Sequence, residues 1–133
     1  MMKNAVITGV SSGIGLATAR SLAANGFKVY GSVRKKEDAL KLKEELGDNY
    51  EPLFFDLTDD KAIKDEAARV AQLVGHQGIQ LLVNNGGISG GDAIMHVSID
   101  YMKHIYDVNT LGLLRVSQAF FPLLKISSAN KSV

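Results

Sequence analysis

The segment Ile7–Gly15, with the sequence ITGVSSGIG, limits the possible folds of this chain more than any other segment. A short apolar run leads into it and an amphipathic stretch follows it, so we expect it to connect a strand to the start of a helix. Backbone N–H groups at a helix N-terminus favour an anion. Gly9, Gly13 and Gly15 lack the Cβ atoms that would block a tight turn, a phosphate, or the packing of the helix on the strand. The segment therefore predicts a strand–loop–helix unit that holds a pyrophosphate.

Two other interpretations of this loop are weaker. A phosphate-binding P-loop ends in Gly-Lys-Ser/Thr, whereas Gly15 is followed by Leu16. A tight connector that binds no ligand is compatible with the glycine pattern alone. The position of the loop at the first strand–helix junction of the chain favours a bound dinucleotide over that alternative.

Short apolar runs alternate with amphipathic stretches along the rest of the chain, which is typical of parallel strands joined by helices. The expected strands are Ala5–Ile7, Lys28–Val33, Leu53–Phe55 and Ile79–Val83. The expected helices are Gly13–Asn25, Lys36–Leu46, one that Thr58 caps and that runs to about Val74, and a long one from Ser98 through Phe120 that Pro122 bends or ends. Right-handed crossovers would order the strands 3-2-1-4. We therefore predict a Rossmann-like α/β fold with a doubly wound parallel sheet that stops after the fourth strand and its helix, with Ile126–Val133 as a polar loop.

Composition narrows the class of protein. The 133 residues have room for one domain, so residues 1–133 are expected to form one partial dinucleotide-binding domain. A net charge of +1 gives no general attraction to nucleic acid or membranes. The absence of cysteine excludes disulfides and thiolate chemistry, and no stretch approaches the length of a membrane span. The cytoplasm is the expected compartment.

Four motifs in order resemble those of the short-chain dehydrogenase/reductase family. TGVSSGIG at Thr8–Gly15 is similar to the TGxxxGxG motif, and Asp56 in FFDLTD matches the acidic residue after the third strand. NNGG at Asn84–Gly87 is similar to the NNAG motif, and Asn109 in DVNTLG matches the asparagine of the catalytic helix. One departure is Gly86, where the family usually has alanine, which would make this loop more flexible. The resemblance covers essentially the whole chain.

The resemblance implies a role for each of these residues. It implies that Thr8, Gly9, Ser11, Ser12, Gly13, Ile14 and Gly15 hold the pyrophosphate, that Asp56 and Leu57 bind the adenine, that Asn85, Gly86 and Gly87 contact the ribose, and that Asn109 anchors a water in the proton relay. Each also has an ordinary structural explanation: Asp56 and Asn85 could be turn residues, and Asn109 a polar residue satisfied within its helix. Those explanations do not account for the joint spacing.

The end of the second expected strand indicates which nicotinamide cofactor is bound. A site that prefers NAD usually has Asp or Glu there, whereas this chain has Val33 followed by Arg34. A guanidinium can bind a phosphate through two hydrogen bonds, and by resemblance Ser11 would add another. Lys35 and Lys36 could add positive charge or simply begin a solvated helix. We predict NADP(H), with NAD(H) disfavoured.

The residues that complete catalysis in the family are missing from the sequence. The family uses a Tyr followed at the fourth position by a Lys, together with a Ser, and none of the four tyrosines here has such a Lys. Ser127 and Ser128 follow Asn109 too closely to leave room for a loop and a strand. The three histidines, His76, His96 and His104, lack metal-ligand spacing and are expected at the surface, so no metal site is predicted.

The sequence therefore predicts the N-terminal part of an NADP(H)-dependent oxidoreductase that transfers hydride to or from a carbonyl or alcohol substrate, with the 133-residue chain inactive on its own. Two alternatives stay open: a non-catalytic dinucleotide-binding module or truncated inactive gene product, and a binding partner that supplies only a helix interface. By resemblance, a homo-oligomer is expected through the long helix around Leu111–Phe121, with an apolar face of Leu111, Leu114, Phe120 and Phe121.

Overall fold

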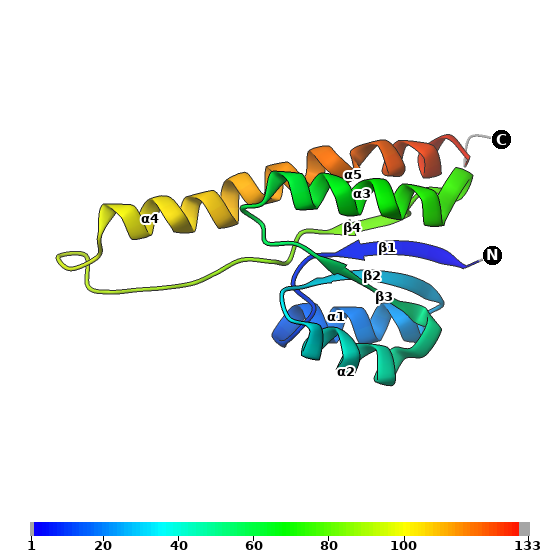
Figure 1. Cartoon of the computed structure of the whole chain (residues 1–133), viewed down its shortest axis with the longest axis horizontal. Coiled ribbons are helices and arrows are strands. Elements are labelled where there is room, and N and C mark those ends of the chain that lie inside the picture. The colour runs from blue at the N-terminus through cyan, green and yellow to red at the C-terminus, as the bar shows by residue number, and fades with distance from the viewer. Residues whose placement is uncertain (1, 131–133) are drawn as a thin grey trace.

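The computed structural model describes residues 2–130 of the chain. Strands and helices alternate from the N-terminus, as the hydrophobic pattern predicts (Figure 1). The elements are β1 (Lys3–Ile7), α1 (Gly13–Ala24), β2 (Phe27–Val33), α2 (Lys36–Leu46), β3 (Tyr50–Phe54), α3 (Asp60–Val74), β4 (Leu81–Val83), α4 (Ile99–Tyr106), a π-helical segment (Asp107–Leu111) and α5 (Gly112–Ala129). Short 3₁₀ turns at Gly47–Asn49 and Gly75–Gln77 precede β3 and β4.

The four strands form one parallel sheet in the order β3-β2-β1-β4, which confirms the predicted topology. Val29 in β2 pairs with Ala5 on one side and with Tyr50 on the other. Helices α1 and α2 cover one face of the sheet, and α3 and α5 cover the other (Figure 1). Neighbouring side chains of a strand point to opposite faces, so Val6 packs with α3 and α5 while Ile7 packs with α1 and α2. The sheet is therefore the middle of three layers.

All four strands differ from their expected bounds, β1 and β2 only by beginning two residues and one residue earlier. β3 begins three residues earlier than predicted, because a strand tolerates Pro52 at the edge of a sheet, where its missing N–H is not needed. β4 covers only Leu81–Val83, and all three residues are half-buried rather than fully buried. The reason is that β4 pairs only with β1 within residues 2–130.

The predicted cap of α3 is wrong by one residue. Asp59, not Thr58, is the N-cap, and its side chain accepts a hydrogen bond from the backbone N of Ala62 at 3.0 Å. The Thr58 hydroxyl donates instead to Oδ1 of Asp56 at 2.9 Å. Both residue types cap helices well, so neighbouring candidates compete on local geometry.

The long C-terminal helix begins as predicted and ends differently. Ser98 caps it by accepting a hydrogen bond from the backbone N of Tyr101 at 3.0 Å. Pro122 lies inside α5, which continues to Ala129, so the start of the expected polar loop is helical; residues 131–133 lie outside the described part. Leu123 and Ser127 are each only 5% exposed. This packing after the proline holds the helix together despite the lost hydrogen bond.

Candidate functional site

A cavity of about 260 Å³ lies at the carboxyl ends of the four strands. Parallel strands all present their carboxyl ends at the same edge of the sheet, so the loops that follow them meet there. The π-helical segment and the last turns of α4 close one side. The lining residues are Gly9, Ser11, Ser12, Ser32, Val33, Arg34, Phe55, Asp56, Leu57, Asn85, Gly86, Gly87, Ile88, His104 and Val108.

The glycine loop after β1 is shaped by contacts that leave no room for side chains. Gly9 has φ of +72°, a conformation that L-residues with a Cβ rarely adopt. A Cβ on Gly15 would lie 1.9 Å from the carbonyl oxygen of Gly9 and 2.4 Å from Nδ2 of Asn85. The loop is also tied to β2, because the N–H of Gly9 donates to Oγ of Ser32 at 2.9 Å. Glycines here therefore allow the loop to fold back against the end of β4.

Thr8 and Asn85 join the loops after β1 and β4. The Thr8 hydroxyl oxygen accepts hydrogen bonds from the backbone N of Asn85 at 3.0 Å and of Gly86 at 2.7 Å. Nδ2 of Asn85 donates to the carbonyl oxygens of Thr8 and Gly9 at 3.0 and 2.9 Å. Thr8 is 1% exposed, so it cannot touch a ligand through its side chain and serves to position the two loops.

Arg34 and Asp56 lie at one end of the cavity. Oδ1 of Asp56 accepts hydrogen bonds from the backbone N and the hydroxyl of Thr58 at 3.0 and 2.9 Å. The backbone hydrogen bond from Thr58 is the main reason that the pKa of Asp56 is lowered, and the charges of Arg34 and His104 act in the same direction. Arg34 is exposed and makes no hydrogen bond or ion pair with any residue of the described chain. Its guanidinium is therefore available to an anionic ligand.

Both polar atoms of the Asn109 amide make a hydrogen bond within the protein. Its Oδ1 accepts from the backbone N of Ile88 at 2.8 Å, and its Nδ2 donates to the carbonyl oxygen of Ile88 at 2.7 Å. Arg115 supports this segment by donating to the carbonyl oxygens of Leu57 and Asp107 at 3.0 and 3.1 Å, and it pairs with the Asp107 carboxylate at 2.5 Å. Asn109 therefore fixes a loop of the cavity wall and does not itself line the cavity.

Nine of the predicted site residues line the cavity: Gly9, Ser11, Ser12, Arg34, Asp56, Leu57, Asn85, Gly86 and Gly87. Thr8, Gly13, Ile14, Gly15 and Asn109 do not. Thr8 and Gly15 are buried behind the loop, whereas Gly13 and Ile14 are exposed, with 79% of Ile14 accessible. The structure thus brings the strand-end residues together and leaves the start of α1 outside the cavity.

Sequence reasoning missed several lining residues, of which His104 is the most polar. It was expected to be an ordinary surface residue, yet it lines the cavity while also being exposed. The signal that could have found it is its spacing, because His104 lies four residues before Val108 and therefore on the same side of the helix. Val108 directly precedes Asn109 in the recognised motif.

Other candidate residues lie elsewhere. Ser127 lines a separate hollow beside Lys3 and His76, at the amino ends of the strands. Among residues 2–130, no group of three or more metal-binding side chains comes together. No helix in that range is long and apolar enough to cross a membrane.

Comparison with known proteins agrees with the fold and the motifs. The family model for short chain dehydrogenases matches residues 3–132, and the chain belongs to that oxidoreductase family. It is 39% identical over 130 residues to an NADPH-dependent 3-dehydrocapnine reductase of Ornithobacterium rhinotracheale, covering 98% of this chain and 46% of that protein. It is 38% identical over 120 residues to a serine 3-dehydrogenase of Agrobacterium fabrum, covering 90% of this chain and 47% of that protein.

Solved structures show the same likeness. The crystal structure of NADPH-bound carbonyl reductase from chicken fatty liver superposes with a TM-score of 0.91 at 30% identity, covering 99% of this chain and 52% of that chain. The carbonyl reductase Sniffer of D. melanogaster superposes with a TM-score of 0.89 at 26% identity, covering all of this chain and 56% of the other. The chain spans about half the length of the curated relatives it matches.

Proposed function

We propose that this chain is the cofactor-binding part of an NADP(H)-dependent short-chain dehydrogenase/reductase that transfers hydride to or from a carbonyl or alcohol substrate. The observation that carries the proposal is Arg34, an unpaired guanidinium at the cavity edge where β2 ends in Val33 instead of an acid. Two of the relatives described above are themselves NADPH proteins by name, which supports the choice of cofactor. The proposed partners are small molecules rather than nucleic acid or membranes, and the proposed compartment is the cytoplasm.

The residues around the cavity fit a dinucleotide with a 2′-phosphate. The glycine loop has no Cβ at the positions where the backbone approaches other chain segments, so it can approach a pyrophosphate as well. Ser11 and Arg34 would hold the 2′-phosphate, which matches the guanidinium fork. Within residues 2–130, Oδ2 of Asp56 accepts no hydrogen bond and the N–H of Leu57 donates none. Both groups would therefore be free to bind the adenine edge. The nicotinamide group supplies the hydride when bound.

Asn109 would act by position. Its Oδ1 and Nδ2 each bond Ile88, so Asn109 would keep this loop in place, and the same segment would anchor a water of the proton relay. Removing a positioned general acid costs about 10²- to 10⁴-fold in rate. Since no tyrosine here carries the family's Lys at the fourth position, we propose that the chain alone does not turn over. Steady oxidation of NADPH with a panel of ketones and aldehydes would contradict this.

An oligomer through α5 is also proposed. Leu111, Leu114 and Phe121 lie at helical spacing and are 38%, 49% and 57% exposed. Phe120, which was expected on the same face, is fully buried in the core between α3, α5 and the sheet, so that assignment is wrong. The remaining stripe supports the proposal of a second copy of this chain as its partner.

The test of the function is the affinity of the chain for NADPH and NADH, followed by calorimetry. We expect NADPH to bind roughly tenfold or more tightly, because the guanidinium contacts a phosphate that NADH lacks. Arg34→Ala should remove that preference and leave NADH affinity nearly unchanged. Lys35→Ala is the matched control, since Lys35 is an exposed neighbouring cation that does not line the cavity. Equal affinities of the wild-type chain for the two cofactors would rule out the assignment of Arg34.

A further inference from the structure

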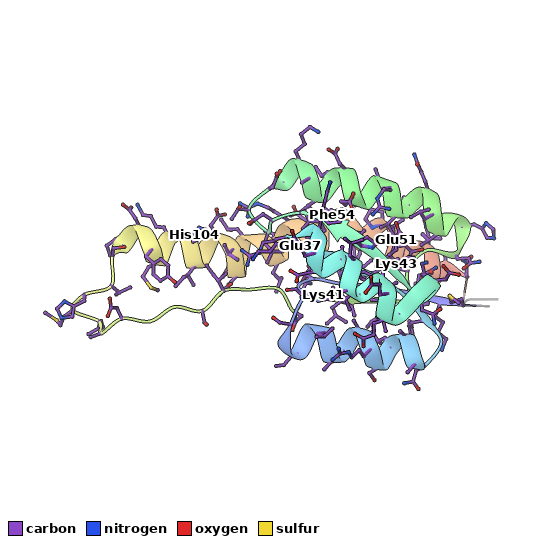
Figure 2. The ribbon with its side chains drawn as sticks, turned by 60° about the horizontal axis from the view of Figure 1, so that its bottom comes forward. Glu37, Lys41, Lys43, Glu51, Phe54 and His104 are labelled. Carbon is purple, nitrogen blue, oxygen red and sulfur yellow. The ribbon has the colours of Figure 1, made fainter. Side chains whose placement is uncertain are left out.

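One wall of the cavity comes from the end of α4 and from the π-helical segment that follows it. His104 of α4 lies outside every motif recognised in the sequence, whereas Val108 of the π-helical segment lies within DVNTLG. Both residues line the cavity, and they are four positions apart. Val108 is 5% exposed, so it forms an apolar base, and the exposed imidazole lies nearer the free end of the helix. Figure 2 shows His104 on the part of α4 that projects beyond the sheet.

Two loops bring polar groups to the same cavity. Arg34 comes after β2, and Asp56 and Leu57 come after β3. Arg34, Asp56 and His104 line the same cavity, and the charges of Arg34 and His104 act in the direction that lowers the pKa of Asp56. His104 therefore shares the cavity in which an adenine edge would meet Asp56 and Leu57.

Apart from the effect of its charge on Asp56, the His104 side chain is not tied to the described chain. It forms no side-chain hydrogen bond or ion pair with residues 2–130, and it is exposed. Its removal should therefore cost the fold little. An imidazole that lines a cavity and makes no hydrogen bond within residues 2–130 presents a flat π-surface on which a nucleobase can stack.

We propose that His104 closes the adenine end of this cavity and packs its imidazole ring against the purine of the dinucleotide, next to Val108. This inference rests on the proposed function, because it assumes that a dinucleotide binds here. Part of the affinity for the adenosine half would then come from α4. This part would be the same whether or not the ribose carries a 2′-phosphate.

The experiment uses two adenosine probes, adenosine 5′-monophosphate and adenosine 2′,5′-bisphosphate, titrated calorimetrically at pH 8, where an ordinary imidazole is neutral. We expect His104→Ala to weaken both probes alike, by about fivefold or more, as loss of a base-stacking side chain does. His104→Phe should retain the wild-type affinity because it keeps an aromatic face. His96→Ala is the matched control, since His96 is an exposed histidine that does not line the cavity.

Each result decides between the two proposals. If His104→Ala weakens only the bisphosphate, the imidazole contacts the phosphate and the base contact is overturned. If His104→Ala binds both probes as the wild type does, His104 has no part in binding. If the wild-type chain binds neither the probes nor NADPH, the proposed function fails and this inference fails with it. The wild-type titrations therefore test the function, and the ratio between variant and wild type tests His104.

Discussion

The two edges of the sheet are built differently. At the β3 edge, side chains from α2 and α3 occupy the backbone groups that point away from β2. Nζ of Lys43 donates to the carbonyl oxygen of Tyr50 at 2.9 Å, and Nη2 of Arg69 donates to that of Pro52 at 2.5 Å. The N–H of Phe54 donates to the Glu66 carboxylate at 3.2 Å. Figure 2 labels Lys43, Glu51 and Phe54 near one another at this edge.

The β4 edge has no such cover. No side chain of residues 2–130 bonds the backbone of Leu81–Val83, whose only strand partner in that range is β1. The backbone groups of an edge strand are therefore protected by side chains of neighbouring helices more than by the strand itself. Lys43, Glu66 and Arg69 belong to helices, and Pro52 adds a position that has no N–H to offer. We therefore expect strand addition at β4 and none at β3.

The largest expected effect concerns self-association through β4. An unpaired apolar edge is a template for pairing, so the isolated chain should be oligomeric or prone to aggregation. Leu81→Lys should shift it towards monomer, because Leu81 is half-buried, belongs to neither hydrophobic cluster, and would place a charge at the edge. Light scattering after size-exclusion chromatography measures the change.

Two control variants separate this edge from other surfaces. Leu73→Lys makes the same substitution at a residue of α3 that is 55% exposed, and it should not change the oligomeric state. Leu114→Glu disrupts the proposed helix interface and leaves β4 intact. A wild-type chain that is a monodisperse monomer would show that something covers the β4 edge, and the comparison of the two edges would lose its basis.

The next effect comes from opening the β3 edge. Arg69 also pairs with Glu51 at 2.7 Å and with Glu66 at 2.9 Å, so Arg69→Ala removes the cationic partner of two carboxylates and exposes the carbonyl of Pro52. We expect a loss of about 1–2 kcal/mol in the free energy of unfolding, measured with urea, because the groups that lose Arg69 are only partly buried and Glu66 keeps its bond from Phe54. Association should rise as well.

The matched control for Arg69 is a fully solvated ion pair on the same helix. Lys61 pairs with Asp65, and their side chains are 86% and 64% exposed, so Lys61→Ala should change the free energy of unfolding far less than Arg69→Ala does. Arg69→Lys should lie between the two, since an ammonium keeps the charge and loses the guanidinium fork. If Arg69→Ala changes stability no more than Lys61→Ala does, the edge is not closed by Arg69.

The topology could be read from the sequence, whereas the closure of one edge could not. The order of strands follows from alternating apolar and amphipathic runs, and most site residues follow strand ends, which parallel strands bring together. The contact of Arg69 with Pro52 depends on how α3 crosses β3, and no local pattern contains that information. His104 was missed for a similar reason, because its place in the cavity wall depends on how α4 lies against the strand ends, although its spacing from Val108 was a signal.

Because local patterns do not contain long-range contacts, two details of the helices were also predicted wrongly. Asp59 and Thr58 have similar capping chemistry, and only the bond between Thr58 and Asp56 decides between them. Pro122 alone predicts a bend or an end of the helix, but the helix continues because Leu123 is buried in the core. Local propensities therefore locate the elements, and long-range packing sets where they stop.

The smallest expected effect is a loss of stability at the β3 edge at high pH. Tyr50 is fully buried, and its hydroxyl donates to the carbonyl oxygen of Gly31 in β2 at 3.1 Å. Burial raises the pKa of Tyr50 above its ordinary value. A raised pKa means that the neutral phenol stabilises the fold fully below the unfolded value of about 10, and that this contribution is lost as the pH rises further. Tyr50→Phe should therefore lower the free energy of unfolding by about 1 kcal/mol at pH 7, because one hydrogen bond is lost. Above about pH 10, this variant should lose less stability than the wild type, because it has no phenol to ionise.

The measurement is the urea unfolding free energy of both proteins from pH 7 to about pH 11, where the unfolded phenol ionises. Lys43 is present in both chains, so its own bond to Tyr50 cancels in the difference, and the gap between the curves should narrow with rising pH. Tyr106→Phe, at a tyrosine that is 59% exposed, is the control and should follow the wild type throughout. Parallel curves for Tyr50→Phe and the wild type would mean that β3 stays anchored to β2 in alkali without the neutral phenol, and that the closure of this edge rests on the helix side chains alone.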